Sequence, residues 1–173
     1  MAVTASRRAR NAAAGARLQG AESDDEFIFE AGNMIKNLMV GVDGSAQASK
    51  AFEHALTLAQ WSGAELHAVA VIHGPDIEMA ESPEREQLVE RARARLQEVL
   101  DSLKSTAAEV DIKLETHLLE GHPVEQLLEL AWQKSVDHLV LGHRSKGLFE
   151  RLLMGSVAKR VVDFARCTVT VVR

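Results

Sequence analysis

Residues 37–72 read NLMVGVDGSAQASKAFEHALTLAQWSGAELHAVAVI, and their pattern indicates the type of fold. Two apolar runs, Asn37–Val42 and Glu65–Ile72, are typical of buried strands. Between them, alanines, leucines and a phenylalanine recur at helical spacing, with Ser45 as the expected N-cap and Gly63 as the residue that ends the helix. A strand, a long helix and a second strand predict a right-handed crossover between parallel strands.

The rest of the chain continues this alternation of strands and helices. The expected elements are a helix from Ser82-Pro83-Glu84 to about Ala108, a strand over Ile112–Leu119, a helix over Pro123–Lys134, a strand over His138–Leu141, a helix over about Phe149–Ala165 and a strand over Cys167–Val172. The Ser82 hydroxyl is expected to cap the first of these helices, with Pro83 at its first position. The sequence therefore predicts one α/β domain of three layers, with helices on both faces of a five-stranded parallel sheet.

Residues 1–33 differ from the rest of the chain. An Ala/Arg/Ser-rich stretch is followed by the acidic patch AESDDEFIFE, and only Phe27, Ile28 and Phe29 form an apolar group. Such a segment buries too little surface to offset the entropy of ordering it, so we expect it to be mostly disordered. Either it is a solvated tail, or translation starts at Met34. The Arg7-Arg8 pair is not followed by the apolar run of an export signal.

Composition excludes several classes of protein. The net charge of −5 and the seven aromatic residues, five Phe and two Trp, argue against a nucleic-acid-binding protein. A single cysteine, Cys167, excludes an internal disulfide and a cysteine-cluster metal site, and indicates a reducing, cytoplasmic location. No apolar run is long enough to span a membrane. The seven histidines show no ligand pair at helical or zinc-finger spacing, so the sequence predicts no metal site.

The stretch GHRSKGLFERLLMGS, residues 142–156, is the candidate for chemistry. A glycine-bearing loop before a helix can direct backbone N–H groups at an anion, and Arg144, Lys146 and Arg151 add positive charge. Gly155 is expected in the second turn of that helix, where glycine costs about 1 kcal/mol relative to alanine, and the Ser156 hydroxyl could reach a phosphate. An ordinary turn with an exposed serine is equally compatible with this spacing. Neither GxGxxG nor GxxxxGK[ST] occurs in the chain.

These residues resemble the G-x2-G-x9-G-[ST] signature of the universal stress protein family. The stretches NLMVGVDGS, GHPVEQLLELA, VDHLVLG and TVTVVR are also similar to that family, so the resemblance covers about residues 34–173. It implies a five-stranded parallel sheet of order 3-2-1-4-5 and dimerisation. In one of the two broad subgroups of the family it also implies adenine-nucleotide binding.

The resemblance also implies a set of nucleotide-binding residues. Asp43 resembles the acid beside the nucleoside, and the Val71 backbone would bind the adenine edge. The second motif glycine is Ser145 here, which keeps a backbone N–H donor but loses the freedom of glycine. Without the resemblance, Asp43 could equally cap backbone amides. The complete set is Gly41, Val42, Asp43, Val71, Leu141, Gly142, Arg144, Ser145, Gly155, Ser156 and Val157.

The expected function is that of an ATP-binding regulatory module in stress adaptation, with or without Mg²⁺ and with little or no catalysis. The alternative is a nucleotide-independent dimeric interaction protein of the same family, with Ser145 marking a lost phosphate loop. A phosphotransfer or nucleotide-cleaving enzyme is a third alternative. The apolar last strand, Thr168–Val172, would be an aggregation hazard unless paired, so we expect a homodimer through it, with an unidentified protein as further partner.

Overall fold

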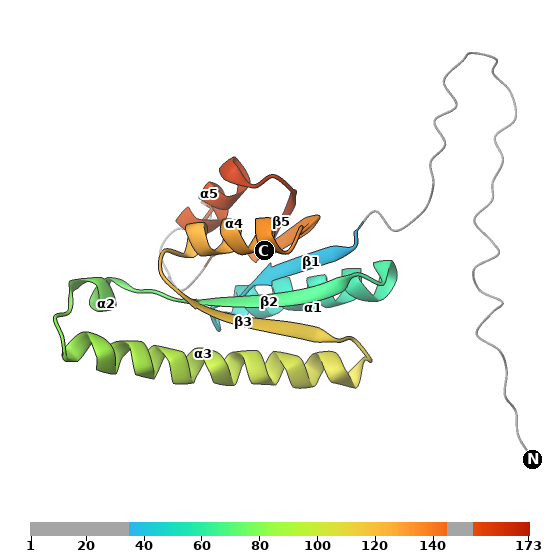
Figure 1. Ribbon diagram of the computed structural model, residues 1–173. Helices are drawn as coiled ribbons and strands as arrows, with labels where there is room; N and C mark the ends of the chain where they lie inside the picture. The colour runs from blue at the N-terminus through green and yellow to red at the C-terminus, as the bar shows by residue number, and fades with distance from the viewer. Residues whose placement is uncertain (1–34, 145–153) are drawn as a thin grey trace, which may run out of the picture. The chain divides into compact units, whose positions relative to one another are not determined.

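The computed structural model describes residues 35–144 and 154–173. In these residues five parallel strands form one sheet of order β3-β2-β1-β4-β5 (Figure 1). Their bounds are β1 Asn37–Gly41, β2 Glu65–Ile72, β3 Leu114–Glu120, β4 His138–Gly142 and β5 Thr168–Val172. The predicted fold class and strand order are therefore confirmed.

The helices cover both faces of the sheet (Figure 1). Their bounds are α1 Ala46–Ser62, α2 Pro75–Met79, α3 Glu84–Glu109, α4 Pro123–Gln133 and α5 Ser156–Phe164. One core joins α1 and α3 to one face of the strands, and includes the fully buried Leu38 and Leu66. A second core joins α4 and α5 to the other face, and includes Met39 and Leu139. Successive strand residues alternate between the two cores because strand side chains alternate in direction.

Helix α1 begins and ends where the sequence predicts. The Ser45 hydroxyl accepts a hydrogen bond from the Ala48 N–H over 3.2 Å. Gly63 follows the helix with a φ of 71°, a left-handed conformation that glycine adopts without strain. This helix is the crossover between β1 and β2, and its start is thus fixed directly after the end of β1.

Two predicted helix starts are wrong. Helix α5 begins at Ser156, so Gly155 lies before the helix and not in its second turn. Gly155 has an extended backbone, and its N–H donates a hydrogen bond to the His143 carbonyl, so it is not part of the helix. Residues 149–153 of the predicted helix lie outside the described parts of the chain. Helix α3 begins at Glu84 with Pro83 at the N-cap position, and no side-chain hydrogen bond from Ser82 or any other residue caps it in the described structure.

Smaller differences concern short elements and exposed side chains. Helix α2 was not predicted, because five residues are too few to show a helical period. Trp61 and Trp132 lie in amphipathic helices but are 83% and 72% exposed, so they do not belong to the core. No helix in residues 35–144 or 154–173 has the length and apolarity that a membrane span requires.

The starts of three strands are tied together at Asp137. Its carboxylate accepts the backbone N–H groups of Lys36 and Asn37, at 2.8 and 2.9 Å, and its carbonyl accepts the Thr168 N–H at 3.1 Å. The two backbone hydrogen bonds, that of Asn37 first, hold the pKa of the Asp137 carboxyl below its usual value. These bonds fix β1, β4 and β5 in register at one end, and the loops at the opposite, carboxyl end carry the predicted site.

Candidate functional site

The ends of β1, β2 and β4 bring several of the predicted site residues together. Gly41 on β1 pairs with Leu141 on β4 and with Val69 on β2. The Val42 N–H donates to the Val69 carbonyl over 2.8 Å, which extends this pairing past the end of β1. In an open parallel sheet, ligands bind at the carboxyl ends of such central strands. Gly41, Val42, Leu141 and Gly142 thus form the floor of the candidate site.

Asp43 makes a local hydrogen bond at this edge. It is half-buried directly after β1, and its Oδ1 atom accepts the Ser45 N–H over 2.9 Å. This contact is the capping interaction that the sequence left open as an alternative. This hydrogen bond directs the Asp43 carboxylate toward the start of α1.

Gly142 is required by packing between elements of the chain itself. A Cβ atom on Gly142 would lie 2.9 Å from the carbonyl carbon of Gln47 and 3.0 Å from the amide nitrogen of Ala48. The first turn of α1 therefore rests on the end of β4 with no room for a side chain. The glycine is explained by this close backbone approach alone, and it brings the amino end of α1 onto the candidate site.

The amino end of α5 lies beside the end of β4. The Gly155 N–H donates to the His143 carbonyl over 2.9 Å, and Ser156, exposed, begins the helix with half-buried Val157 next. No side chain of the described residues caps α5, and no acidic residue occupies its first turn. The first N–H groups of a helix have no partner within it and carry partial positive charge. This helix end is thus suited to an anion.

The charges around this helix end are positive. Arg144 follows β4, and Lys159 and Arg160 lie on α5. His143 is buried at the same place, and burial, followed by Arg173 and Arg144, lowers the pKa of its imidazole. At neutral pH His143 is therefore uncharged, and the positive potential comes from the arginines, the lysine and the helix.

The remaining predicted residues are placed less directly. Val71 is the last residue but one of β2. It packs against the core on the α4 side and pairs with Leu119 of β3. Strand β1 lies between β2 and β4, so Val71 is separated from β4 by one strand. Ser145, and with it Lys146, Gly147 and Arg151, lies outside the described residues.

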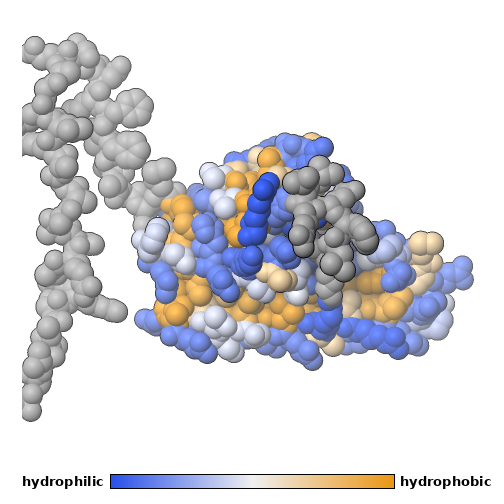
Figure 2. Space-filling view, turned by 180° about the vertical axis from the view of Figure 1, so that it is seen from behind, coloured by the Kyte–Doolittle hydropathy of each residue, from blue (hydrophilic) through white to orange (hydrophobic). Residues whose placement is uncertain are grey.

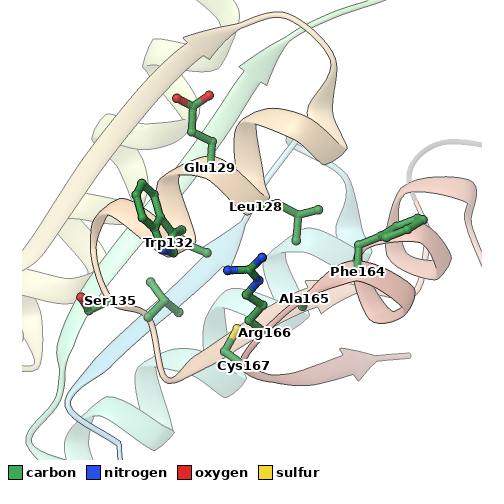
Figure 3. A pocket seen from close by; sticks show the side chains of 10 residues that line it. Leu128, Glu129, Trp132, Ser135, Phe164, Ala165, Arg166 and Cys167 are labelled. Carbon is green, nitrogen blue, oxygen red and sulfur yellow. The ribbon is translucent and has the colours of Figure 1, made fainter.

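A cavity of about 670 Å³ opens at the other end of the sheet. Trp132 of α4 and Phe164 of α5 border it, and the side chain of Arg166 extends between the two helices (Figure 3). Val136 and Cys167 line it from the segments that precede β4 and β5. Sequence analysis missed this cavity, because tryptophan and phenylalanine in amphipathic helices have the pattern of core residues.

Cys167 is packed rather than reactive. It is half-buried at this cavity, and burial first of all raises the pKa of its thiol. A thiol with a raised pKa holds little of the reactive thiolate at neutral pH. Its partly buried position directly before the apolar strand β5 is consistent with packing.

The chain is similar to proteins of one known family in both sequence and structure. The sequence profile of the Universal stress protein family matches residues 34–173. The chain belongs to the universal stress protein family. Universal stress protein MJ0531 from Methanocaldococcus jannaschii is 34% identical over 150 residues, which are 86% of this chain and 88% of that protein.

Solved structures of the family agree with this fold. Universal stress protein UspA from Lactobacillus plantarum superposes with a TM-score of 0.71 at 29% identity, over 80% of this universal stress protein and 98% of that chain. One family structure was solved in complex with cAMP, with a TM-score of 0.61 at 24% identity over 80% of this chain and 97% of that one. The universal stress protein from Archaeoglobus fulgidus was solved with dAMP, with a TM-score of 0.59 at 21% identity over 81% and 99%. At these two identities the likeness concerns the fold alone.

Proposed function

We propose that this universal stress protein binds an adenine nucleotide, ATP with or without Mg²⁺, and acts as a regulatory module in the stress response. The observation that carries the proposal is the amino end of α5, which no side chain of the described residues caps and which the Gly155 to His143 hydrogen bond of 2.9 Å holds beside the end of β4. Free N–H groups at a helix N-terminus bind phosphate groups. The cAMP and dAMP complexes of two family members support an adenine nucleotide as the ligand class.

The proposed pose follows the positions of the site residues. The phosphates would lie on Gly155, Ser156 and Val157, near Arg144 and Ser145, and the adenine near Asp43 and the Val71 backbone. Asp43 already accepts the Ser45 N–H, so its carboxylate has a structural role. We therefore propose hydrolysis that is weak at most, with nucleotide occupancy acting on an unidentified protein partner. The cytoplasmic location stays a prediction from the lone cysteine.

The direct test is release of bound nucleotide. The full-length protein is purified without added nucleotide, denatured, and the supernatant analysed by mass spectrometry. We expect ATP, ADP or AMP in an amount close to that of the protein, because a phosphate held by several backbone N–H groups dissociates slowly. Absence of nucleotide, together with no calorimetric signal up to millimolar ATP, would contradict the proposal.

A second candidate function is a nucleotide-independent dimeric interaction protein of the same family. The position of β5 supports the dimer, which this candidate shares with the first, because this short strand forms one edge of the sheet and four of its five residues, Val169–Val172, are only half-buried. Exposed Phe164 and Val162 of α5 lie just before it in the chain. An unpaired apolar edge is a template for pairing with another chain. The space-filling view shows hydrophobic residues reaching the surface on one face of the molecule (Figure 2).

Both candidates predict a homodimer through Thr168–Val172. We expect light scattering of the full chain at micromolar concentration to give twice the 18.9 kDa of one chain. Val169→Lys and Val171→Lys would place charges on half-buried side chains of this edge strand, which also pack against the core on the α4 side. Variants that keep the circular dichroism of the fold should give the monomer mass. A monomer for the unmodified protein would exclude the pairing, and a dimer without released nucleotide would favour the second candidate.

A further inference from the structure

Three side chains of β2 and β3 bring metal-binding atoms together on the α4 side of the sheet. Each of His67, Glu115 and His117 offers one ligand atom, and these atoms lie within 4.8 Å of one another. The parallel register pairs His67 with Glu115, and His117 follows two residues later on the same face of β3. The sheet backbone itself therefore places the three side chains side by side.

The distances from His67 to the other two residues match those between ligands of a tetrahedral metal ion. His67 Nδ1 lies 3.3 Å from His117 Nε2 and 3.4 Å from Glu115 Oε2, whereas the carboxylate oxygen 3.5 Å from His117 Nε2 is the other one, Oε1. In a tetrahedral zinc site with bonds of about 2.0–2.1 Å, neighbouring ligand atoms are about 3.3–3.4 Å apart. In the metal-free protein the same 3.3 Å contact is a hydrogen bond between two neutral imidazoles.

The carboxylate is held in place by a positive group. Lys134, which follows the last residue of α4, donates from Nζ to Glu115 Oε1 over 2.7 Å. This leaves Oε2 facing His67. Hydrogen bonds to the outer oxygen of a ligating carboxylate are a common feature of metal sites, because they fix the orientation of the ligand. Lys134 is thus a positioning residue and not a ligand.

The two histidines of the cluster are mostly buried, whereas the glutamate is exposed to solvent. The His67 side chain is 3% exposed and that of His117 14%, whereas Glu115 is 49% exposed. Burial first of all lowers the pKa of both imidazoles, and the Lys134 hydrogen bond lowers the pKa of the Glu115 carboxyl. Neutral imidazoles and an ionised carboxylate are the forms that bind metal. The exposed side leaves room for a water molecule as fourth ligand.

We propose that His67, Glu115 and His117 bind a divalent transition-metal ion of the zinc class, with water completing the tetrahedron. Two imidazoles and one carboxylate are a donor set that zinc takes when a water or substrate occupies the fourth position. The site joins β3, an edge strand, to β2, and it lies near the amino ends of these strands. It is therefore separate from the loops at the carboxyl ends, and it does not depend on nucleotide binding.

The test uses Co²⁺ as a spectroscopic probe of the full-length protein. After treatment with a chelator and buffer exchange, the protein is titrated with Co²⁺ and the visible absorption of tetrahedral cobalt is recorded. We expect saturation at one Co²⁺ per chain and loss of the absorption when Zn²⁺ is added. Zn²⁺ should also raise the thermal midpoint, because a ligand that binds only the folded state stabilises it.

Two variants and one matched control make the assignment specific. His117→Gln and Glu115→Gln each remove one ligand, and both should lose the cobalt absorption and the thermal shift while keeping the circular dichroism of the fold. His138→Gln is the control, because His138 is also a half-buried strand histidine with one ring hydrogen bond, to Thr170 at 2.8 Å. If His117→Gln does not fold, the exposed Glu115 variant still decides the question.

Three results would overturn the proposal. The first is no saturable Co²⁺ or Zn²⁺ binding up to millimolar metal. The second is unchanged binding in a folded His117→Gln or Glu115→Gln protein. The third is an equal loss in the His138→Gln control, which would place the metal elsewhere on the chain.

Discussion

Replacing Gly155 with glutamate is expected to weaken ATP binding at least about a hundredfold, which corresponds to about 2.7 kcal/mol. Gly155 precedes α5 with φ −61° and ψ 152°, a conformation open to any residue, so the substitution is compatible with the fold. The new carboxylate would lie at the uncapped helix end, where it takes the place proposed for phosphate and repels it. The same charge is favourable at a helix N-terminus, so stability should not fall by much.

Gly155→Gln is the matched control for charge. It has nearly the same shape as the glutamate variant, and both meet the same crowding, since a Cβ atom would lie 3.2 Å from the His143 carbonyl oxygen. Calorimetric titration with ATP should therefore show a much smaller loss for glutamine than for glutamate. Equal affinities of the glutamate variant and the unmodified protein, with both folded, would remove α5 from the binding site.

Replacing Gly142 with alanine is expected to lower the free energy of unfolding by about 1–3 kcal/mol, the range of overpacked cores. The added Cβ would meet backbone atoms of Gln47 and Ala48 at 2.9 to 3.0 Å, closer than Cβ atoms come to other atoms. Backbone cannot rotate away as a side chain can, so α1 must shift from the end of β4. Urea denaturation followed by circular dichroism measures this change.

Gly74→Ala is the matched control for a glycine without close neighbours. Among the described residues, its two chain neighbours aside, no atom lies within 4 Å of the position of an added Cβ, and the backbone there is extended with φ 168°. Its stability should stay within about 0.5 kcal/mol of the unmodified protein. If the two alanine variants were equally stable, the contact between α1 and the end of β4 would not be tight.

Most of the fold could be predicted from the sequence because its strands are short apolar runs between clear helix signals. Ser45 and Gly63 mark the ends of α1 through interactions within a few residues, and such local signals are visible in a sequence. The strand order needed the family resemblance, since alternation alone gives parallel strands but not their neighbours. The start of α5 could not be predicted, because it depends on a hydrogen bond from Gly155 to the distant His143.

Some residues of the candidate site can likewise be predicted from local sequence signals, and others depend on contacts between distant parts of the chain. Gly41, Val42 and Gly142 follow directly from the ends of predicted strands. The reason for Gly142 lies in α1, almost a hundred residues earlier in the chain. Likewise His67 and His117 are fifty residues apart, and only the register of β2 against β3 brings them together. Spacing along the chain therefore could not reveal this pair.

The backbone of His143 makes hydrogen bonds to two different parts of the chain. Its N–H donates to the Val172 carbonyl over 2.6 Å, and its carbonyl accepts the Gly155 N–H over 2.9 Å. One peptide segment thus connects the terminal strand to the helix end proposed for phosphate. If occupancy of that helix end changes self-association, thermodynamic reciprocity requires self-association to change ligand affinity by the same factor. The factor by which ligand changes the self-association constant and the factor by which self-association changes the ligand affinity, measured separately, should then be equal.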